Sequence, residues 1–382
     1  MTAFACPYDP LSPDQLRDPY PAWAERPPVF YDERLGMWSV TGYEEVLAVL
    51  RDTATFSSAG AFALRGFPRP RMLVAKDPPE HTQLRKRMQR AFTPRRVAEM
   101  EPFIAQTCHE LAESLQSDLM AEYANALPLR VITRILGFDS GEGPALRQWT
   151  EDFLVLATPA AGDEDGGDPE RIARMEAVME RTRALIAARR EDPRDDVISA
   201  LAALDLDDDD VITLALELVI AGNDTTANLI AHMVGFLLED RARWERVRAD
   251  RSLVPVAVEE TLRRRGSSKG LFRRVTRDVE LAGEAVAAGA IVHVLFAAAN
   301  HDEARFERPR EFDLDRPKAD HLAFGRWTHF CLGAPLARLE ARVALDVLLD
   351  RHPGLHAVPG QRLDYAPTLT TQTLEKFLVE LR

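Results

Sequence analysis

Cys331 lies in a segment whose residue types favour metal chemistry. The segment 324–338 reads FGRWTHFCLGAPLAR, with His329 two residues before the cysteine and Pro335 four residues after it. The proline and the apolar spacing behind it predict a helix that begins just after the cysteine. The N–H groups and the dipole of a helix N-terminus favour a thiolate. Because no Cys or His stands at zinc-finger spacing, the thiolate suits a metal already ligated on four sides, which is haem iron.

A second chemical cluster reads AGNDTT over residues 221–226, in the middle of a predicted long helix. Glycine inside a helix costs about 1 kcal/mol relative to alanine, so Gly222 needs a reason. We expect the missing side chain to let a flat ligand approach the backbone, and Thr225 to bond a backbone carbonyl. A crossing of two helices through small residues explains Ala-Gly alone. It does not explain Asp-Thr-Thr on the same turn.

The elements that must position these groups are mainly helical. Helical spacing dominates from about residue 76 to 265, interrupted at 162–169 and at the acidic run 205–210. Asp208 to Asp210 supply caps and N-terminal carboxylates for the long helix, which runs to Leu238. Glycine and proline predict a loop over 57–75. Short helices are expected at 20–24 and 42–50, and strands at 29–31, 37–40, 273–276, 279–281 and 291–294.

Composition excludes several classes of protein. The 382 residues are 46% hydrophobic and 29% charged, an ordinary globular composition, and the net charge of −13 argues against nucleic acid as a general partner. Three cysteines without pairing logic indicate the cytoplasm, with Cys6 and Cys108 buried and inert. We expect no signal peptide, because the first ten residues lack a basic and an apolar region. No apolar run approaches the roughly 18 residues that span a bilayer, so we expect a soluble protein without a membrane partner.

The segment around Cys331 resembles the haem-binding loop of the cytochrome P-450 family, F-G-x-G-x-H-x-C-x-G. Trp327 stands where the family has its second glycine. AGNDTT matches the family's oxygen-binding motif A-G-x-D-T-T, and Glu260 and Arg263 match its E-x-x-R. Each motif except the cysteine loop is weak alone, but their order and spacing together identify the family from about residue 15 to the end.

The resemblance implies a role for each matching residue. Cys331 ligates the iron of haem b, Thr225 hydrogen-bonds the bound oxygen, and Asp224 gates protons toward it. The remaining haem contacts are Ala221, Gly222, Phe324 and Gly333, with His81, Arg85, Arg273 and His329 on the propionates. Arg316 completes a structural triad with Glu260 and Arg263.

The resemblance also implies fold and function. The fold is mainly α with small β-sheets, one domain over 1–382, with haem between the long central helix and the cysteine loop with its following helix. The activity is a monooxygenase that uses dioxygen on a small organic substrate, with electrons from a ferredoxin or flavodoxin and its reductase. Two alternatives stay open: an atypical or peroxide-driven oxidase, which the Asp224–Thr225 pair disfavours, and a non-catalytic haem-thiolate sensor.

Substrate contacts are expected by family position at 60–74, 153–175, 217–221, 268–272 and 370–372. The named candidates are Glu217, Ile220, Lys269, Gly270 and Leu271. Glu217 replaces an apolar residue, and a carboxylate is costly to bury unless it is paired. It therefore either binds a cationic or hydrogen-bonding group of the substrate, or makes a structural pair with an arginine or faces outward.

The proximal face carries two further expectations. Lys86, Arg87 and Arg90 form a basic surface on which an acidic electron donor docks. A bulky residue at Trp327 disfavours positive φ, so we expect a locally altered loop that places Trp327 on the proximal surface.

Overall fold

The structure, a computed structural model, describes residues 8–61, 72–157, 168–317 and 320–381, and it is mainly helical with small sheets, as predicted. The α-helices are α1 Pro13–Arg17, α2 Tyr20–Ala24, α3 Tyr43–Arg51, α4 Glu80–Met88, α5 Pro94–Glu99, α6 Glu101–Ser114, α7 Ala126–Leu136, α8 Gly143–Ala157, α9 Pro169–Glu191, α10 Val197–Ala202, α11 Asp208–Glu239, α12 Arg241–Ala249, α13 Val254–Arg265, α14 Phe296–Ala299 and α15 Ala334–Arg351. Shorter helical turns are η1 Leu73–Ala75, η2 Gln89–Phe92, η3 Met120–Ala124, η4 Ser140–Glu142, η5 Arg251–Leu253 and η6 Trp327–His329. The strands are β1 Val29–Asp32, β2 Met37–Val40, β3 Phe56–Ser57, β4 Leu271–Val275, β5 Val279–Leu281, β6 Glu284–Val286, β7 Ile291–Val294, β8 His356–Ala357 and β9 Val379–Glu380.

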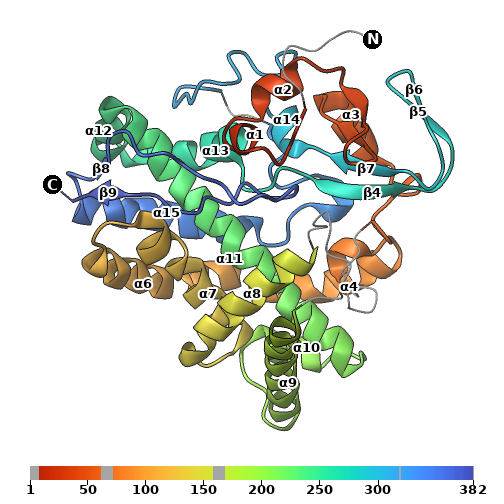
Figure 1. The fold of residues 1–382 in the computed structure, drawn as a ribbon. Helices are drawn as coiled ribbons and strands as arrows, with labels where there is room; N and C mark the ends of the chain where they lie inside the picture. Colours follow the sequence, from red (N-terminus) through yellow and green to blue (C-terminus); the bar gives the residue numbers. More distant parts are fainter. Residues whose placement is uncertain (1–7, 62–71, 158–167, 318–319, 382) are drawn as a thin grey trace.

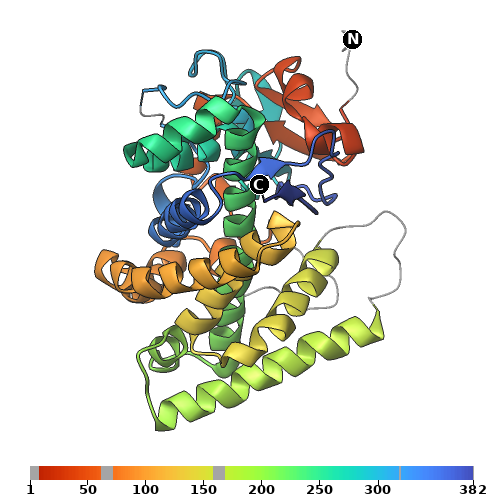
Figure 2. The ribbon, with the colours of Figure 1, turned by 90° about the vertical axis from the view of Figure 1, so that its left-hand side faces the viewer.

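Helix α11 is the central element of the molecule. It runs through the middle of the helical part, with α8, α9 and α10 near its N-terminal end and α12 and α13 near its C-terminal end (Figures 1 and 2). Its apolar side chains are buried around most of its circumference, which is the pattern of a helix enclosed by other helices. The site-bearing residues 221–226 therefore lie midway along a helix whose other buried side chains belong to the main core.

The start of α11 corrects one expectation. Asp207, rather than a residue of the 208–210 run, is the N-cap, and its side chain accepts the N–H of Asp210 at 2.7 Å. Asp208, Asp209 and Asp210 occupy the first turn, where carboxylates favour the helix dipole. The acidic run thus starts the helix one residue earlier than the spacing indicated.

The main sheet has five strands in the order β1-β2-β7-β4-β3. Strand β2 pairs with β7 in parallel, and the other pairs are antiparallel. Strand β7 matches the predicted 291–294, whereas β4 begins two residues earlier than predicted, at Leu271. The extension is possible because Gly270 has no side chain: a β-carbon there would meet the Val294 carbonyl oxygen at 2.1 Å.

The segment 57–75, predicted as a loop, contains the end of β3 and the turn η1 in its described part. Residues 62–71 lie outside the described residues, as do 162–167 of the predicted interruption. Across the part of the chain that the structure describes, no helix is long and apolar enough to cross a membrane.

Candidate active site

Cys331 lies between the turn η6 and helix α15. Its N–H donates to the carbonyl oxygen of Phe324 at 2.8 Å, which closes the loop on itself. Gly333 is the N-cap of α15, so the cysteine directly precedes a helix N-terminus, as the sequence indicated. Burial raises the pKa of the Cys331 thiol, while hydrogen bonds from the Gly333 and Ala334 N–H groups and the charge of Arg85 act in the opposite direction. The loop therefore holds the sulfur of Cys331 at the N-terminus of α15, where the positive charge of Arg85 acts on it.

Trp327 lies in this loop with φ +50° and its side chain 48% exposed. The exposed position of Trp327 agrees with the expectation. We also expected the bulky side chain to force the backbone out of the left-handed region, and this does not occur. The tryptophan adopts the conformation that a glycine would take, at a steric cost of about 1–2 kcal/mol. The Arg51 guanidinium of α3 lies over its ring, 5.9 Å from the centroid.

Four basic side chains gather beside the cysteine loop. His81 and His329 lie with ring centroids 4.2 Å apart, and the charge of Arg85 lowers the pKa of both. Burial is the larger cause and takes the pKa of His81 to about 4 and that of His329 to about 3. Burial also lowers the pKa of Arg273 to about 10. No ion pair joins Arg85 or Arg273 to a carboxylate among the described residues.

This cluster fits the carboxylates of a haem. Buried arginines are normally paired with an anion, yet Arg273 is 2% exposed and donates only to the Phe272 carbonyl, at 2.7 Å, within the described part. Both ring nitrogens of His81 are buried without a hydrogen-bond partner there. The Ser58 hydroxyl contacts His329, with its Oγ 3.1 Å from Nε2 of the imidazole. Two propionates would supply the missing acceptors, and Arg binds carboxylate bidentately.

Ala221 and Gly222 face different sides of α11. Ala221 is exposed in the middle of an otherwise buried helix, which leaves one helix face open for a flat group. A β-carbon at Gly222 would instead point to Ile132 of α7 at 3.4 Å, an ordinary packing distance. We expected the missing side chain of Gly222 to make room for a ligand. That expectation is wrong, because the space that a side chain would take at Gly222 faces the neighbouring helix α7.

Asp224 and Thr225 follow on the same turn. The Thr225 hydroxyl donates to the Ala221 carbonyl oxygen, as predicted for a helix-interior threonine. The Asp224 carboxylate accepts from the Thr373 hydroxyl at 2.8 Å, and burial raises its pKa. Asn228, one turn later, donates to the Asp224 carbonyl at 2.8 Å.

Glu260, Arg263 and Arg316 lie together in the buried core next to α15. Arg263 is fully buried and makes a two-pronged contact with the Glu260 carboxylate, each bond 2.8 Å. Arg316 donates to the same carboxylate at 3.0 Å. Arg263 also donates to three main-chain carbonyls, those of Asn300, Pro309 and Glu311. The three side chains thus join α13 to the segment that leads to the cysteine loop.

Glu217 makes a contact that the sequence did not predict. Its two carboxylate oxygens accept the N–H groups of Leu73 and Val74 at 2.7 and 3.0 Å. Within the described residues, neither expected structural alternative is seen: Glu217 is buried, and its hydrogen-bond partners there are backbone N–H groups rather than an arginine. Burial raises the pKa of Glu217 to about 7.

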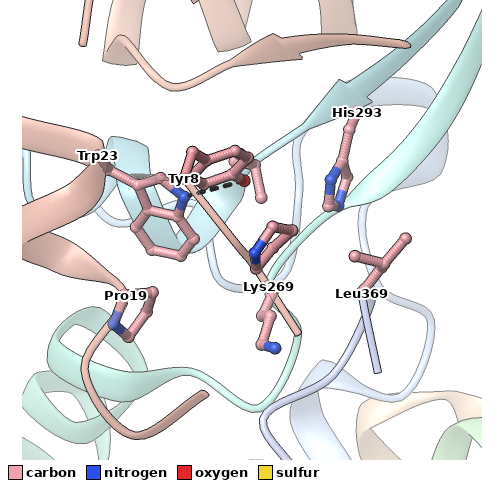
Figure 3. Close-up of a pocket in the computed structure, with 8 residues that line it drawn as sticks. Tyr8, Pro19, Trp23, Lys269, His293 and Leu369 are labelled. Carbon is pink, nitrogen blue, oxygen red and sulfur yellow. Dashed lines mark hydrogen bonds between the residues drawn. The ribbon is translucent and has the colours of Figure 1, made fainter. Parts of the chain in front are cut away.

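The other substrate candidates take varied positions. Lys269 is buried and donates to the Thr368 carbonyl at 2.7 Å, at the edge of a small pocket that it shares with Tyr8 and His293 (Figure 3). Gly270 faces the backbone of β7, as described above. Ile220 is partly buried against the main core, and Leu271 against the cluster around the five-stranded sheet.

The basic surface of α4 is exposed at Lys86 and Arg87, which have no ion pair with another described residue. The side chain of Arg90 lies outside the described part. Cys108 is buried, and burial raises its pKa to about 12, as expected for an inert thiol; Cys6 lies outside the described residues.

Sequence reasoning missed Ser58, Asn228 and Thr373. Each is a polar residue of ordinary type whose partner lies on a distant segment. Only the hydroxyl-rich run TLTTQT over 368–373 offered a signal, and its spacing does not indicate which group it would meet.

This fold brings one cysteine at a helix N-terminus next to basic groups that have no carboxylate partner among the described residues, an arrangement that fits a haem-thiolate protein. The model of the family Cytochrome P450 matches residues 170–353. The chain is 35% identical to the putative cytochrome P450 YjiB of Bacillus subtilis, covering 89% of this chain and 88% of that protein. It is 35% identical to the mycinamicin IV hydroxylase/epoxidase of Micromonospora griseorubida, covering 92% and 90%. Among solved structures, CYP109E1 from Bacillus megaterium in complex with testosterone matches with a TM-score of 0.87 and 32% identity, covering 97% of this chain and 99% of that one.

The chain belongs to the cytochrome P450 family, of the bacterial type. It is a P450 monooxygenase, an oxidoreductase, and its cofactor is haem b bound through a cysteine thiolate. The predictions of family, fold class, enzyme class and cofactor are thereby confirmed.

Proposed function

We propose that Cys331 supplies the thiolate and that the whole chain works as one haem domain that oxidises an organic substrate with electrons from separate proteins. The observation that carries this proposal is the convergence of Cys331 with Arg85, Arg273, His81 and His329, none of which is paired to a carboxylate among the described residues. Haem b held by a thiolate supplies the reduction of dioxygen and the transfer of one of its atoms to the substrate.

The chain's own residues hold and orient the reactants. Arg85 and Arg273 would bind the carboxylates of the haem through charge-assisted hydrogen bonds. The exposed Ala221 would leave room for the haem on one face of α11. Burial raises the pKa of the Asp224 carboxyl, which lies on the same turn of α11 as Thr225, and Asp224 serves as the proton donor of the site.

The substrate is a small, largely apolar organic molecule. The relatives named above include a hydroxylase of mycinamicin IV and a P450 solved with testosterone, and other relatives are steroid C26-monooxygenases of Mycobacterium tuberculosis. Ile220 and Leu271 are the apolar candidates for contact with it.

A ferredoxin or flavodoxin, itself reduced by a reductase, supplies the electrons. Exposed Lys86 and Arg87 support this, because they lie on the helix whose Arg85 faces Cys331. Three cysteines without pairing logic support a cytoplasmic location, where such donors operate.

The experiment begins with Cys331→Ala. The wild-type protein, reduced and exposed to carbon monoxide, should show the red-shifted Soret band of thiolate ligation, and the variant should lose it. Cys108→Ala is the control and should keep the band. Survival of the band in Cys331→Ala would overturn the assignment.

Turnover separates the alternatives. NADPH consumption with surrogate ferredoxin and reductase, matched by oxygenated product, supports the monooxygenase. Product formed with hydrogen peroxide but not with the electron donors supports the peroxide-driven oxidase. No product under either condition supports the sensor.

A further inference from the structure

The Asp224 carboxylate begins a chain of hydroxyl groups that leads away from α11. Thr373 Oγ1 lies 2.8 Å from the carboxylate, Thr371 Oγ1 lies 2.9 Å from Thr373 Oγ1, and Thr368 Oγ1 lies 2.8 Å from Thr371 Oγ1. All three threonines come from one loop near the end of the chain, 149 residues from Asp224 in the case of Thr373. Three consecutive contacts at hydrogen-bond distance make a continuous path.

The path has a consistent direction. Each hydroxyl has one hydrogen to donate and can accept from a neighbour. Because Thr373 donates to Asp224, Thr371 must donate to Thr373, and Thr368 then donates to the Thr371 hydroxyl at 2.8 Å. The Thr371 carbonyl oxygen, 3.0 Å away, is a second acceptor for the same Thr368 hydroxyl. When Asp224 carries a proton, the same contacts can all reverse. A chain that can run in either direction is what proton transfer by successive hops requires.

Both ends of the loop are fixed. Asn228 Oδ1 accepts the N–H of Leu374 at 2.7 Å, while its amide group donates to the Asp224 carbonyl, so one side chain joins the loop to α11. At the far end Lys269 Nζ donates to the Thr368 carbonyl at 2.7 Å, and the Lys269 N–H donates to the Thr370 carbonyl at 2.8 Å. Thr368 is partly exposed, as are Thr371 and Thr373. The loop therefore places one hydroxyl at Asp224 and connects it to a second partly exposed hydroxyl, that of Thr368, two contacts further on.

We propose that Thr368, Thr371 and Thr373 form a hydroxyl relay that carries protons from water to Asp224. The proposal rests on the proposed function, in which Asp224 is the proton donor of the site. In each transfer Thr373 gives its hydrogen to the carboxylate, Thr371 gives its own to Thr373, and Thr368 gives its own to Thr371. A proton from solvent water restores Thr368, so one proton enters the chain and one leaves it. The three threonines act on the reaction only through Asp224 and are therefore positioning residues.

Charged groups around Asp224 set its proton affinity. Burial raises the pKa of Asp224, and the hydrogen bonds from Thr373 and Asn228 lower it. From α8, Arg147 lowers it and Glu151 raises it. Thr373 is therefore both the last member of the path and a group that stabilises the carboxylate, and the two roles can be separated by substitution.

The experiment compares Thr373→Val and Thr371→Val, which remove a hydroxyl with little change of shape. Thr373→Ser is the rescue. Thr213→Val is the matched control, because the Thr213 hydroxyl lies on the same helix α11 as Asp224 and bonds only the Asp209 carbonyl among the described residues.

The first measurement is an infrared titration of the Asp224 carboxyl, which needs no turnover and is assigned with Asp224→Asn. Thr373→Val should raise the pKa of Asp224 by about one unit, the usual effect of losing one hydrogen bond to a charged group. Thr371→Val should leave it within a few tenths, because Thr373 still donates. Thr373→Ser should restore the wild-type value.

The second measurement is coupling: the fraction of NADPH electrons found in product rather than hydrogen peroxide, together with the solvent deuterium isotope effect. Both valine variants should lose at least about fivefold in coupling, and Thr213→Val should match wild type. Substrate affinity from the Soret shift should stay within twofold in all variants. Thr371→Val should therefore leave the pKa of Asp224 unchanged and still lower the coupling. A purely structural role of Thr371 would not produce this combination.

Wild-type coupling in Thr371→Val, or a tenfold loss of its substrate affinity, would overturn the relay; the second result would make the hydroxyls substrate contacts. Failure of the proposed function looks different, because the wild-type protein would then lack the thiolate band or form no product. The infrared titration still decides in that case: an unchanged pKa in Thr373→Val would remove the contact on which the relay depends.

Discussion

Glu217 Oε2 accepts the main-chain N–H of Leu73 at 2.7 Å, so the N-terminal half of α11 holds a turn that lies 144 residues earlier in the chain. The second carboxylate oxygen holds the next N–H, that of Val74. Among the described residues, this buried carboxylate is paired with backbone donors. Burial raises its pKa, and the two backbone hydrogen bonds and the charge of Lys76 act in the opposite direction. The contact gives Glu217 a structural role, and its role toward substrate stays a prediction.

The raised pKa of Glu217 predicts a pH dependence of stability. The folded protein keeps the proton up to about pH 7, whereas the unfolded chain releases it near the ordinary value of 4.5. The contribution of protonated Glu217 to the free energy of unfolding is therefore fully present below about pH 4.5 and is lost as the pH rises to about 7. Relative to Glu217→Gln, the free energy of unfolding of the wild type should fall by up to about 3 kcal/mol between pH 5 and 8.

Urea unfolding at several pH values measures this difference. The exposed Glu176→Gln of α9 is the control and should show no such trend. An equal difference between wild type and Glu217→Gln at pH 5 and pH 8 would contradict the prediction.

Arg263→Lys should destabilise the protein although it keeps the charge. The guanidinium fills a fully buried position with two bonds to Glu260 and three to main-chain carbonyls, and lysine cannot reproduce that geometry. Breaking such a buried pair costs about 3–5 kcal/mol. We expect a lower unfolding midpoint and loss of haem during gel filtration.

The control for this experiment is Arg248→Lys, at an exposed pair with Glu245 on α12. It should change stability by less than about 1 kcal/mol. Equal haem retention in Arg263→Lys and wild type would show that the buried network is not needed to hold the cofactor.

Comparing Trp327→Gly with Trp327→Ala distinguishes the effect of the backbone conformation at this position from the effect of the indole ring. Both remove the indole under Arg51, but only glycine relieves the cost of φ +50°. Trp327→Gly should therefore be about 1 kcal/mol more stable than Trp327→Ala. If the exposed ring contacts the electron donor, both variants should show the same slower donor-dependent reduction, measured by stopped flow. A rate equal to wild type in both would make the position neutral for docking.

Lys86→Glu should slow reduction by an acidic donor several-fold at low ionic strength, and the difference should shrink as salt is added. Lys376→Glu is the matched control, because Lys376 is also exposed but precedes β9, on the opposite side of the molecule from α4 (Figure 1). Stopped-flow reduction at several salt concentrations provides the measurement. Equal rates for the two variants would count against a donor site on α4.

The sequence predicted the local parts of this site well, because they depend on short-range patterns. Strand β7 begins and ends where the pattern placed it, and Cys331 precedes α15 as the proline indicated. Glu260 and Arg263, three residues apart on one helix, were expected to meet, and the structure brings them together.

The contacts that could not be predicted join residues far apart in the chain. Nothing around Glu217 indicates the N–H groups of Leu73 and Val74, and nothing around Asp224 indicates Thr373. The sequence also did not predict that the open side of Gly222 faces α7. Helix periodicity shows which residues share a face but not which neighbouring element packs against that face.

The bond between Asn228 and Leu374 links the order of synthesis to the completion of the site. The two residues are 146 positions apart, so α11 leaves the ribosome long before the partner of Asn228 exists. Until then the side-chain oxygen of Asn228 lacks this donor, although its NH2 group can already donate to the Asp224 carbonyl of the same helix. A nascent chain can therefore assemble the helices and the cysteine loop while the surroundings of Asp224 remain open, and they close only after Thr373 and Leu374 have been made.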